Sequence, residues 1–168
     1  IEIKKISIQE DVMEKKLCMN VRVPGEYKIS ALGMDVEFKL KESFQLEEIP
    51  INRYTKWFDY DTIRNGLSIR TRENGDYIVL DGQGHKKLLK RWMIDEKIPR
   101  EERDQMLLLA DGAHVLWIIG YRISDSYKVT SSTCRVMEVN VRCEPHERGY
   151  DSYTIDRERS GYPDLRTG

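Results

Sequence analysis

Apolar and charged residues alternate along several short stretches of the chain, a period of two that is typical of strands with one solvent-exposed face. In residues 34–40 every even position is apolar and every odd position is charged. Nearer the N-terminus, Pro24 and Gly25 favour a turn between residues 20–23 and 27–30. The first third of the chain is therefore predicted to form a hairpin or a meander.

Two further regions of strand are predicted in the middle of the chain. Residues 67–72 alternate again, which places Arg70 and Arg72 on the same outward face. Residues 106–110 and 115–119 are apolar and lie on either side of an Asp-Gly pair, which is a strong hairpin signal. We therefore expect a hairpin over residues 106–119.

The period changes near Gly84, where apolar positions begin to recur at helical spacing. One side of this predicted helix is apolar and the other is basic: the first holds Leu88, Leu89, Trp92 and Met93, and the second holds Lys86, Lys87, Lys90, Arg91 and Lys97. Pro99 ends the helix and can begin a second, short helix over residues 100–104, because proline fits the first turn of a helix but not its interior.

The last predicted strand covers residues 134–141, and alternate side chains point into the core. Its buried side holds Met137, Val139 and Val141, and its exposed side holds Glu138, Asn140 and Arg142. We expect helix and strands to share one core that includes Leu88, Leu89, Trp92, Ile118 and Val139. Several strands with one principal amphipathic helix and a short second helix predict an α+β domain.

Charge is balanced over the whole chain but not along it. The 168 residues carry 28 basic and 29 acidic side chains, so affinity for nucleic acid would have to come from local clusters. Residues 62–103 form a positive block, with 10 basic and 7 acidic residues. Lysine and arginine commonly solvate an exposed helical face, which is the plainer interpretation. We expect no carboxylate partners at i,i+4 spacing on the basic side, however, and uncompensated repulsion suggests an anionic partner.

The two ends of the chain differ from its middle. Residues 144–168 are polar and poor in aliphatic side chains, which predicts a disordered tail unless its tyrosines dock on the domain or on a neighbouring copy. The chain begins with Ile1 rather than Met, which suggests a piece of a longer protein. No apolar run approaches the roughly 20 residues that span a bilayer. The three scattered cysteines suit reduced thiols, so we expect a cytoplasmic protein without membrane contact.

The sequence shows no clear catalytic or metal site. His85, His114 and His146 have no metal-ligand spacing with the cysteines, so we expect no metal and no cofactor in this chain. Residues 82–84 (GQG) lack the rest of a nucleotide-binding loop and are interpreted as a flexible turn ahead of the helix, whose N-terminus could accept a phosphate. The paired acids of the helical region are expected to pair with neighbouring bases. From the residues alone, this is a binding domain.

Five blocks of the sequence follow one another in a distinctive order: 67–76 (LSIRTRENGD), 84–89 (GHKKLL), 95–104 (DEKIPREERD), 115–123 (VLWIIGYRI) and 128–130 (KVT). In order and spacing they resemble the C-terminal region of bacterial tRNA(Ile)-lysidine synthetases, and the resemblance covers about residues 18–142. It implies layered, mostly antiparallel sheets, a β-sandwich of unusual topology.

The resemblance also implies a function for the intact enzyme. Members of the family use ATP to adenylate the wobble cytidine of an isoleucine tRNA and then join lysine to it, which gives lysidine. In the family this chemistry belongs to an N-terminal ATP-pyrophosphatase domain that is absent here. The fragment alone is therefore expected to be inactive, and its implied role is to hold the tRNA at the acceptor stem.

The family's basic motifs can be carried over position by position. The Lys-Lys pair falls on Lys86 and Lys87, the Lys-Ile-Pro motif on 97–99, the following Arg on Arg103, and Gly-x-Arg on Gly120 and Arg122. Residues 73–77 and 80–82 depart from the family pattern and lose one basic residue, so RNA contact by the loop 73–82 is not implied. The candidate RNA-binding residues are Arg70, Arg72, Lys86, Lys87, Lys90, Arg91, Lys97, Arg100, Arg103 and Arg122.

Two functions of different classes remain open from the sequence. The first is a tRNA-binding domain over residues 18–143, with a lead-in at 1–17 and the polar tail at 144–168. The second is an interaction module whose same surface packs on the catalytic domain or on a second copy, as in a homodimer. Salt distinguishes them, because phosphate binding through several cations weakens steeply with ionic strength and an apolar interface does not.

Overall fold

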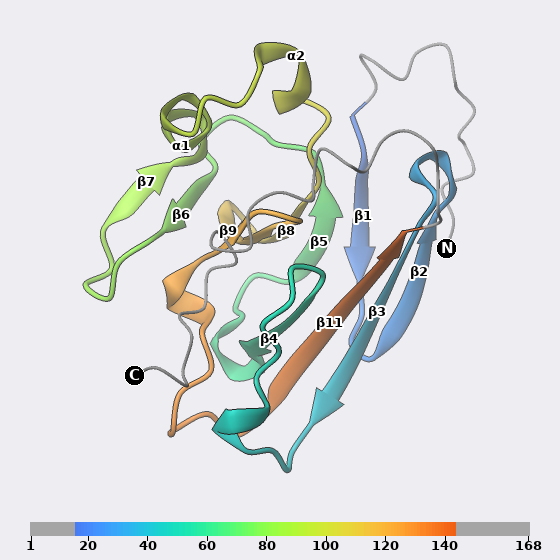
Figure 1. Ribbon diagram of the computed structural model, residues 1–168, viewed down its shortest axis with the longest axis vertical. Helices are drawn as coiled ribbons and strands as arrows, with labels where there is room; N and C mark the ends of the chain where they lie inside the picture. The colour runs from blue at the N-terminus through green and yellow to red at the C-terminus, as the bar shows by residue number, and fades with distance from the viewer. Residues whose placement is uncertain (1–15, 144–168) are drawn as a thin grey trace.

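The computed structural model describes residues 16–143, which form two sheets and two short helices (Figure 1). The strands are β1 Cys18–Val21, β2 Gly25–Ile29, β3 Met34–Lys41, β4 Thr55–Asp59, β5 Leu67–Arg70, β6 Tyr77–Val79, β7 Lys86–Leu88, β8 Leu108–Asp111, β9 His114–Ile118, β10 Arg122–Ile123 and β11 Val136–Cys143. The helices are α1 Leu89–Asp95 and α2 Arg100–Arg103, and single 3-10 turns lie at Ser30–Leu32, Leu46–Glu48, Tyr60–Thr62 and Asp125–Tyr127.

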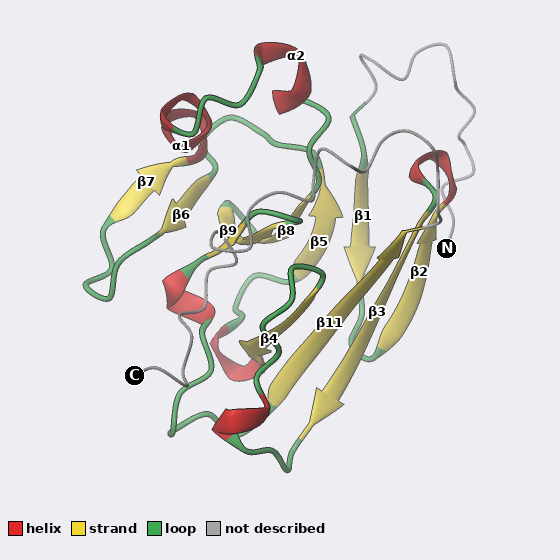
Figure 2. Cartoon of the chain, in the orientation of Figure 1, coloured by secondary structure: helices red, strands yellow, loops and turns green. Residues whose placement is uncertain are grey.

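The larger sheet has the strand order β1-β5-β8-β9-β6-β7, with β10 also paired to β9, and the smaller sheet has the order β2-β3-β11-β4. Within the described range, every strand pairing is antiparallel except a short parallel contact between β6 and β9. Strands dominate over helices (Figure 2). The predicted α+β class with mostly antiparallel sheets, one principal helix and a short second helix is confirmed.

The hairpin predicted over residues 106–119 is confirmed as β8–β9. It lies at the centre of the molecule, because both of its faces are covered. Leu107 and Leu109 point toward the smaller sheet, whereas Met106 and Leu108 point toward α1. Two apolar cores therefore lie on opposite sides of the larger sheet. This arrangement explains the unbroken apolar run at 106–110, which is typical of a strand that is buried on both faces.

The smaller sheet packs its inner face against the larger sheet, and part of its outer face is covered by a third apolar cluster of Ile49, Trp57, Val129 and Val136. Met137, Val139 and Val141 point into the core between the sheets, as predicted, although β11 runs two residues further along than expected. On the outer face, the Trp57 Nε1 donates a hydrogen bond of 3.0 Å to the Glu138 carboxylate. Alternation along the last strand was therefore sufficient to orient its side chains.

The hairpin predicted between residues 20–23 and 27–30 is wrong. β1 belongs to the larger sheet, where it pairs with β5, and β2 belongs to the smaller sheet, where it pairs with β3. The hairpin is instead β2–β3, and it turns at Gly33, whose φ of 62° is in the left-handed region. A turn signal shows that the chain reverses, but it does not show which strands become neighbours.

The predicted helix begins later than expected, at Leu89. Residues 86–88 form strand β7 and pair with β6, so 82–84 lie in the β6–β7 hairpin loop and not at the start of the helix. Leu89, Trp92 and Met93 are buried as predicted, but Leu88 points outward and is 57% exposed. The short second helix over 100–103 is confirmed.

The expectation of a single shared core is also wrong. Leu89, Trp92 and Ile118 belong to the core beneath α1, whereas Val139 belongs to the core between the sheets. The larger sheet separates the two cores, which spacing along the chain does not reveal. The predictions for the tail at 144–168 and for residues 1–15 lie outside the described residues.

Candidate functional site

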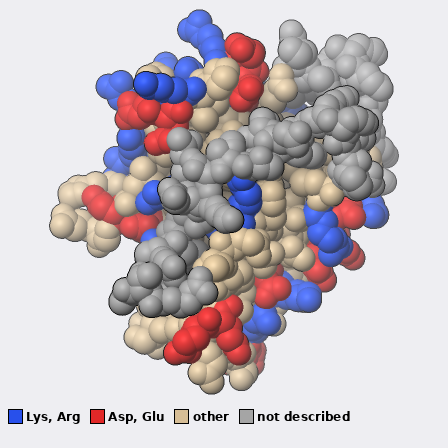
Figure 3. Space-filling view, viewed as in Figure 1, with Lys and Arg blue, Asp and Glu red and all other residues tan. Residues whose placement is uncertain are grey.

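Basic side chains gather over β7, α1 and α2, at the upper left of Figure 3. Residues 86–103 contain 7 basic and 4 acidic side chains. We define the basic face as Lys86, Lys87, Lys90, Arg91, Lys97, Arg100 and Arg103. The larger sheet positions it, because α1 packs Leu89, Trp92 and Met93 onto the sheet and turns its remaining side chains outward.

The charges on α1 run against the helix dipole. Lys90 and Arg91 lie in the first turn, which contains no acidic residue, and Asp95 ends the helix. Cations near a helix N-terminus and anions near its C-terminus are each unfavourable by roughly 0.3–1 kcal/mol. This order of charges does not stabilise the helix, so it suits an external anionic partner better than an isolated helix.

Three members of the basic face have partners within the domain. The Lys87 ammonium lies 2.7 Å from the Asp95 carboxylate and holds the pKa of that carboxyl below its usual range, with a smaller contribution from Arg91. The Lys86 ammonium lies 4.5 Å from the centroid of the Tyr77 ring. Arg103 Nε donates a hydrogen bond of 2.9 Å to the Ile98 carbonyl. Asp95 thus pairs with Lys87 across eight residues of sequence, a partner that a search at i,i+4 spacing does not find.

Three other members of the basic face are exposed, and their side chains have no partner in the described part of the chain. Within residues 16–143, the side chains of Lys90, Lys97 and Arg100 form neither ion pairs nor hydrogen bonds. Lys97 also has a φ of 57°, in the left-handed region that favours glycine at the end of a helix. A lysine therefore occupies a position where backbone geometry alone favours glycine, as expected if its side chain has a use.

Arg70 does not point outward as predicted. It is 4% exposed, and its two terminal nitrogens donate to the Asp76 carboxylate at 2.9 and 2.8 Å. A further bond of 2.8 Å reaches the Gly112 carbonyl. Alternation placed Arg70 correctly on the face away from the smaller sheet, but the turn that carries Asp76 covers that face. Arg70 is therefore a structural residue.

Arg72 and Arg122 lie on the α1 side of the larger sheet. Arg72 Nε donates to Asp104 at 2.7 Å, which ties the strand end to the segment after α2. Arg122 is half-buried and pairs opposite Ile118, whose side chain belongs to the core beneath α1. The Arg122 Nε has no hydrogen-bond partner in the described part of the chain.

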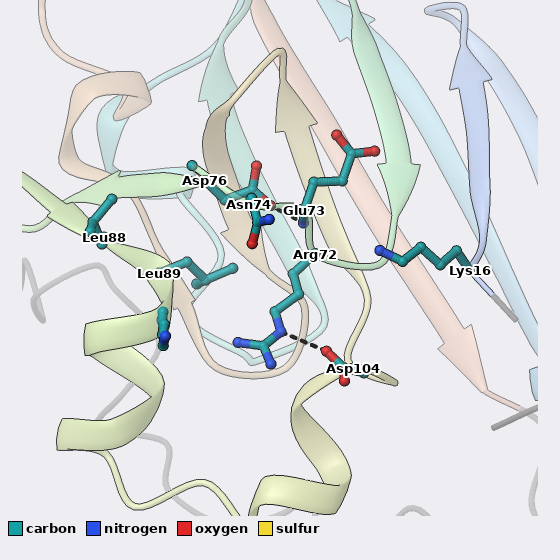
Figure 4. Close-up of a pocket in the computed structure, with 10 residues that line it drawn as sticks. Lys16, Arg72, Glu73, Asn74, Asp76, Leu88, Leu89 and Asp104 are labelled. Carbon is teal, nitrogen blue, oxygen red and sulfur yellow. Dashed lines mark hydrogen bonds and ion pairs between the residues drawn. The ribbon is translucent and has the colours of Figure 1, made fainter. Parts of the chain in front are cut away.

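A pocket of about 300 Å³ adjoins the basic face. Its lining includes Lys16, Arg72, Asn74, Leu88, Lys90 and Asp104. Leu88 and Leu89 lie on one side and Lys16 on the other, with Arg72 between them (Figure 4). Sequence reasoning missed Lys16 and Asn74, because nothing local links the chain before β1 to the turn at 73–76.

His114 is a structural histidine. Its Nε2 lies 2.9 Å from the Ser124 hydroxyl, and its ring lies between Tyr77 and Tyr127, with centroids 4.5 and 4.7 Å away. Burial lowers the pKa of His114 to about 4, so the ring is neutral at pH 7. Among residues 16–143 no group of histidine, cysteine and carboxylate side chains could hold a metal ion, and no helix is long and apolar enough to cross a membrane.

These features define a class of protein, namely a layered α+β domain with an exposed basic face on its described part. Residues 67–148 match the profile of the family described as "TilS substrate C-terminal domain". The chain is 36% identical over 137 residues to tRNA(Ile)-lysidine synthase of Caldanaerobacter subterraneus subsp. tengcongensis, covering 82% of this chain and 28% of that protein. It is 42% identical over 136 residues to the enzyme of the same name from Dehalococcoides mccartyi, covering 76% of this chain and 28% of the relative.

A solved structure agrees with these sequence matches. The crystal structure of a TilS C-terminal domain superposes with a TM-score of 0.63 and 25% identity, over 79% of this chain and all of the other. The chain therefore belongs to the family of tRNA(Ile)-lysidine synthase C-terminal domains. It spans less than a third of the length of these synthases.

Proposed function

We propose that this domain binds an isoleucine tRNA, at its acceptor stem, for a lysidine synthase. The observation that carries the proposal is the basic face, in which Lys90, Lys97 and Arg100 are exposed without partners among residues 16–143. Duplex RNA offers its phosphates and 2′-hydroxyls to a protein more readily than its base edges. An exposed surface of separate cations suits that kind of contact.

The proposed RNA-binding residues follow from the geometry. Lys90, Arg91, Lys97 and Arg100 contact phosphates directly, and Lys86, Lys87, Arg103 and Arg122 contribute at the border. Arg72 is held by Asp104 and shapes the neighbouring pocket. Arg70 is excluded because Asp76 occupies its guanidinium.

We further propose that the domain proper covers residues 18–143, between a lead-in at 1–17 and a tail at 144–168. The adenylation of the wobble cytidine with ATP, and the joining of lysine, belong to another part of the intact enzyme. That enzyme acts where tRNA is modified, in the cytoplasm. The domain supplies affinity for the tRNA at a distance from the reacting base.

A binding titration tests the proposal. Purified chain is titrated with an isoleucine tRNA at several salt concentrations, and the affinity is measured by fluorescence anisotropy. The double variant Lys90→Glu/Arg91→Glu should bind more weakly, and each lost phosphate contact should reduce the magnitude of the log–log salt slope by roughly 0.7–0.9. The matched control is Arg22→Glu/Lys39→Glu, which changes the net charge equally at two exposed sites outside the basic face.

The alternative function is an interaction module. It draws support from Leu88 and Ile94, which are large, apolar and exposed beside the basic face. If the basic-face variant and the control weaken binding to the same small extent, the cations act only through net charge and the tRNA proposal fails. Self-association that is insensitive to salt would then favour the interaction module.

A further inference from the structure

The pocket beside the basic face is built from segments that are far apart in the sequence. Lys16 precedes β1, Arg72 and Asn74 follow β5, and Leu88 and Lys90 lie at the junction of β7 with α1. The turn at 73–76 is fixed in place by three hydrogen bonds to the Asp76 carboxylate. Two come from the terminal nitrogens of Arg70, and one of 2.7 Å comes from the backbone N–H of Glu73. The pocket therefore has a rigid wall.

The pocket has more unpaired basic side chains than unpaired acidic ones. Of its three acids, Asp76 pairs with Arg70 and Asp104 pairs with Arg72 at 2.7 Å, which leaves only Glu73 to offset the two lysines Lys16 and Lys90. Lys16 and Lys90 make no ion pair with any other part of the chain that the structure describes. The Lys16 ammonium points from the β1 side toward the turn (Figure 4). Two unpaired ammonium groups at one small pocket favour an anionic group as the occupant.

The remaining lining is not that of a simple anion site. Leu88 is 57% exposed at the pocket, and Leu89 lies behind it on the same side. Asn74 adds an exposed side-chain amide, which can both donate and accept hydrogen bonds. An anionic group, a flat apolar moiety and a hydrogen-bonding edge occur together in a nucleotide.

We propose that this pocket binds one unpaired nucleotide of the RNA, at the end of its paired stem. Lys16 and Lys90 hold the phosphate, Leu88 packs against the face of the base, and Asn74 meets the edge of the base. A volume of about 300 Å³ is at the lower limit for small-ligand sites, so it suits a single nucleotide and not a duplex. An unpaired base enters a pocket at the lowest cost, because no base pair has to be broken. The inference rests on the proposed function.

Two RNA hairpins with the same stem test the inference, one blunt and one with a single-stranded 3′ overhang. Each is titrated with the whole chain at two salt concentrations. We expect the overhang to raise affinity for the unmodified chain by about 5-fold, the size expected when part of one apolar side chain is covered. Leu88→Ala should remove this advantage and leave affinity for the blunt hairpin unchanged. Ile94→Ala is the matched control, because Ile94 is exposed on α1 but does not line the pocket.

The outcomes separate the two proposals. If both hairpins bind with a steep salt dependence but equally tightly, the nucleotide pocket is wrong and the tRNA-binding role stands. If the overhang helps but Leu88→Ala and Ile94→Ala behave alike, the pocket is also wrong. If neither hairpin binds with a salt-dependent affinity, the proposed function fails and the pocket fails with it. Because Leu88 is exposed, its truncation should not unfold the domain, which a thermal melt verifies.

Discussion

Arg70 and Asp76 form a buried ion pair that anchors the turn at 73–76. The pair is bidentate, and both side chains are nearly inaccessible to solvent. Asp76 raises the pKa of Arg70, since the hydrogen bonds to the carboxylate outweigh the loss of solvation. A buried pair of this kind stabilises little in total, but removal of one partner leaves an uncompensated charge.

We expect Arg70→Met to lower the free energy of unfolding by about 3–5 kcal/mol, measured by urea denaturation, because Asp76 would remain buried without its partner. The double variant Arg70→Met/Asp76→Leu should recover much of the loss. If the single variant were as stable as the parent, the pair would be exposed in solution and the rigid pocket wall would be in doubt.

Lys56 is a buried lysine with no hydrogen-bond partner in the described range. It is 1% exposed and lies opposite Val139, on the inner face of the smaller sheet. Burial, and to a smaller extent Arg53, lowers the pKa of Lys56 to about 8. At pH 7 the domain therefore carries a buried charge at a cost in stability.

Lys56→Met should accordingly stabilise the domain at pH 7, by about 1–3 kcal/mol. The unfolded lysine holds its proton up to a pKa of about 10.5, so the parent gains stability as the pH rises from about 8 to 10.5 and the variant does not. The difference between the two unfolding free energies should therefore shrink toward pH 10. If Lys56→Met instead lowered the unfolding free energy as much as a core truncation does, the Lys56 ammonium would have to be well solvated in the folded state.

The half-buried His114 makes stability depend on mild acid. Burial is the main cause of its low pKa, and Asp111 and Lys86 act in opposite directions on it. The folded pKa of about 4 is below the unfolded value of 6.5, so the unfolded state binds the proton first. The contribution of His114 is complete above pH 6.5 and is lost as the pH falls toward 4.

We expect this loss to be of order 1–3 kcal/mol between pH 6.5 and 4. The measurement is the unfolding free energy of the parent and of His114→Phe at several pH values. The comparison is needed because carboxylates titrate in the same range in both proteins. The parent should lose more stability than the variant over this window. Equal losses would mean that His114 is accessible to protons in the folded state.

At the scale of elements, sequence pattern identified seven of the eleven described strands and both helices, but it missed β4, β6, β7 and β10. The apolar positions at 88, 89, 92 and 93 fit a helical period, yet the chain turns from strand to helix between Leu88 and Leu89. A three-residue edge strand is too short to show alternation, and its pairing with β6 is set by contacts across the hairpin loop. The Lys-Lys pair at 86 and 87 also suits an exposed sheet edge.

Trp92 holds α1 on the larger sheet. It is buried in the core beneath the helix, with its ring edge-on to Tyr121 at 6.0 Å. Trp92→Ala should lower the free energy of unfolding by about 3–5 kcal/mol and detach the basic face. Ile94→Ala, on the exposed side of the same helix, should cost less than about 1 kcal/mol. Similar melting temperatures for both variants would mean that the helix packs with a different face.

At the scale of the molecule, the candidate site depends on contacts between distant segments. The positive block at 62–103 and the family resemblance were sufficient to find the basic face. They did not show that Arg70 is internal, that Lys87 reaches Asp95, or that Lys16 lines the same pocket as the start of α1. Alternation indicates which face of a strand a residue occupies, but only the packed structure shows what covers that face.

The last prediction concerns an intact lysidine synthase that carries this domain. Lys90→Glu/Arg91→Glu removes phosphate contacts that we expect to be equally strong in the ground state and in the transition state, because the domain lies away from the reacting cytidine. Loss of uniform binding raises KM and leaves kcat nearly unchanged. Steady-state kinetics with varied tRNA should therefore show KM rising by about 10-fold, the effect of roughly 1.4 kcal/mol of lost binding. A fall in kcat at unchanged KM would instead mean that the basic face helps to position the tRNA for reaction.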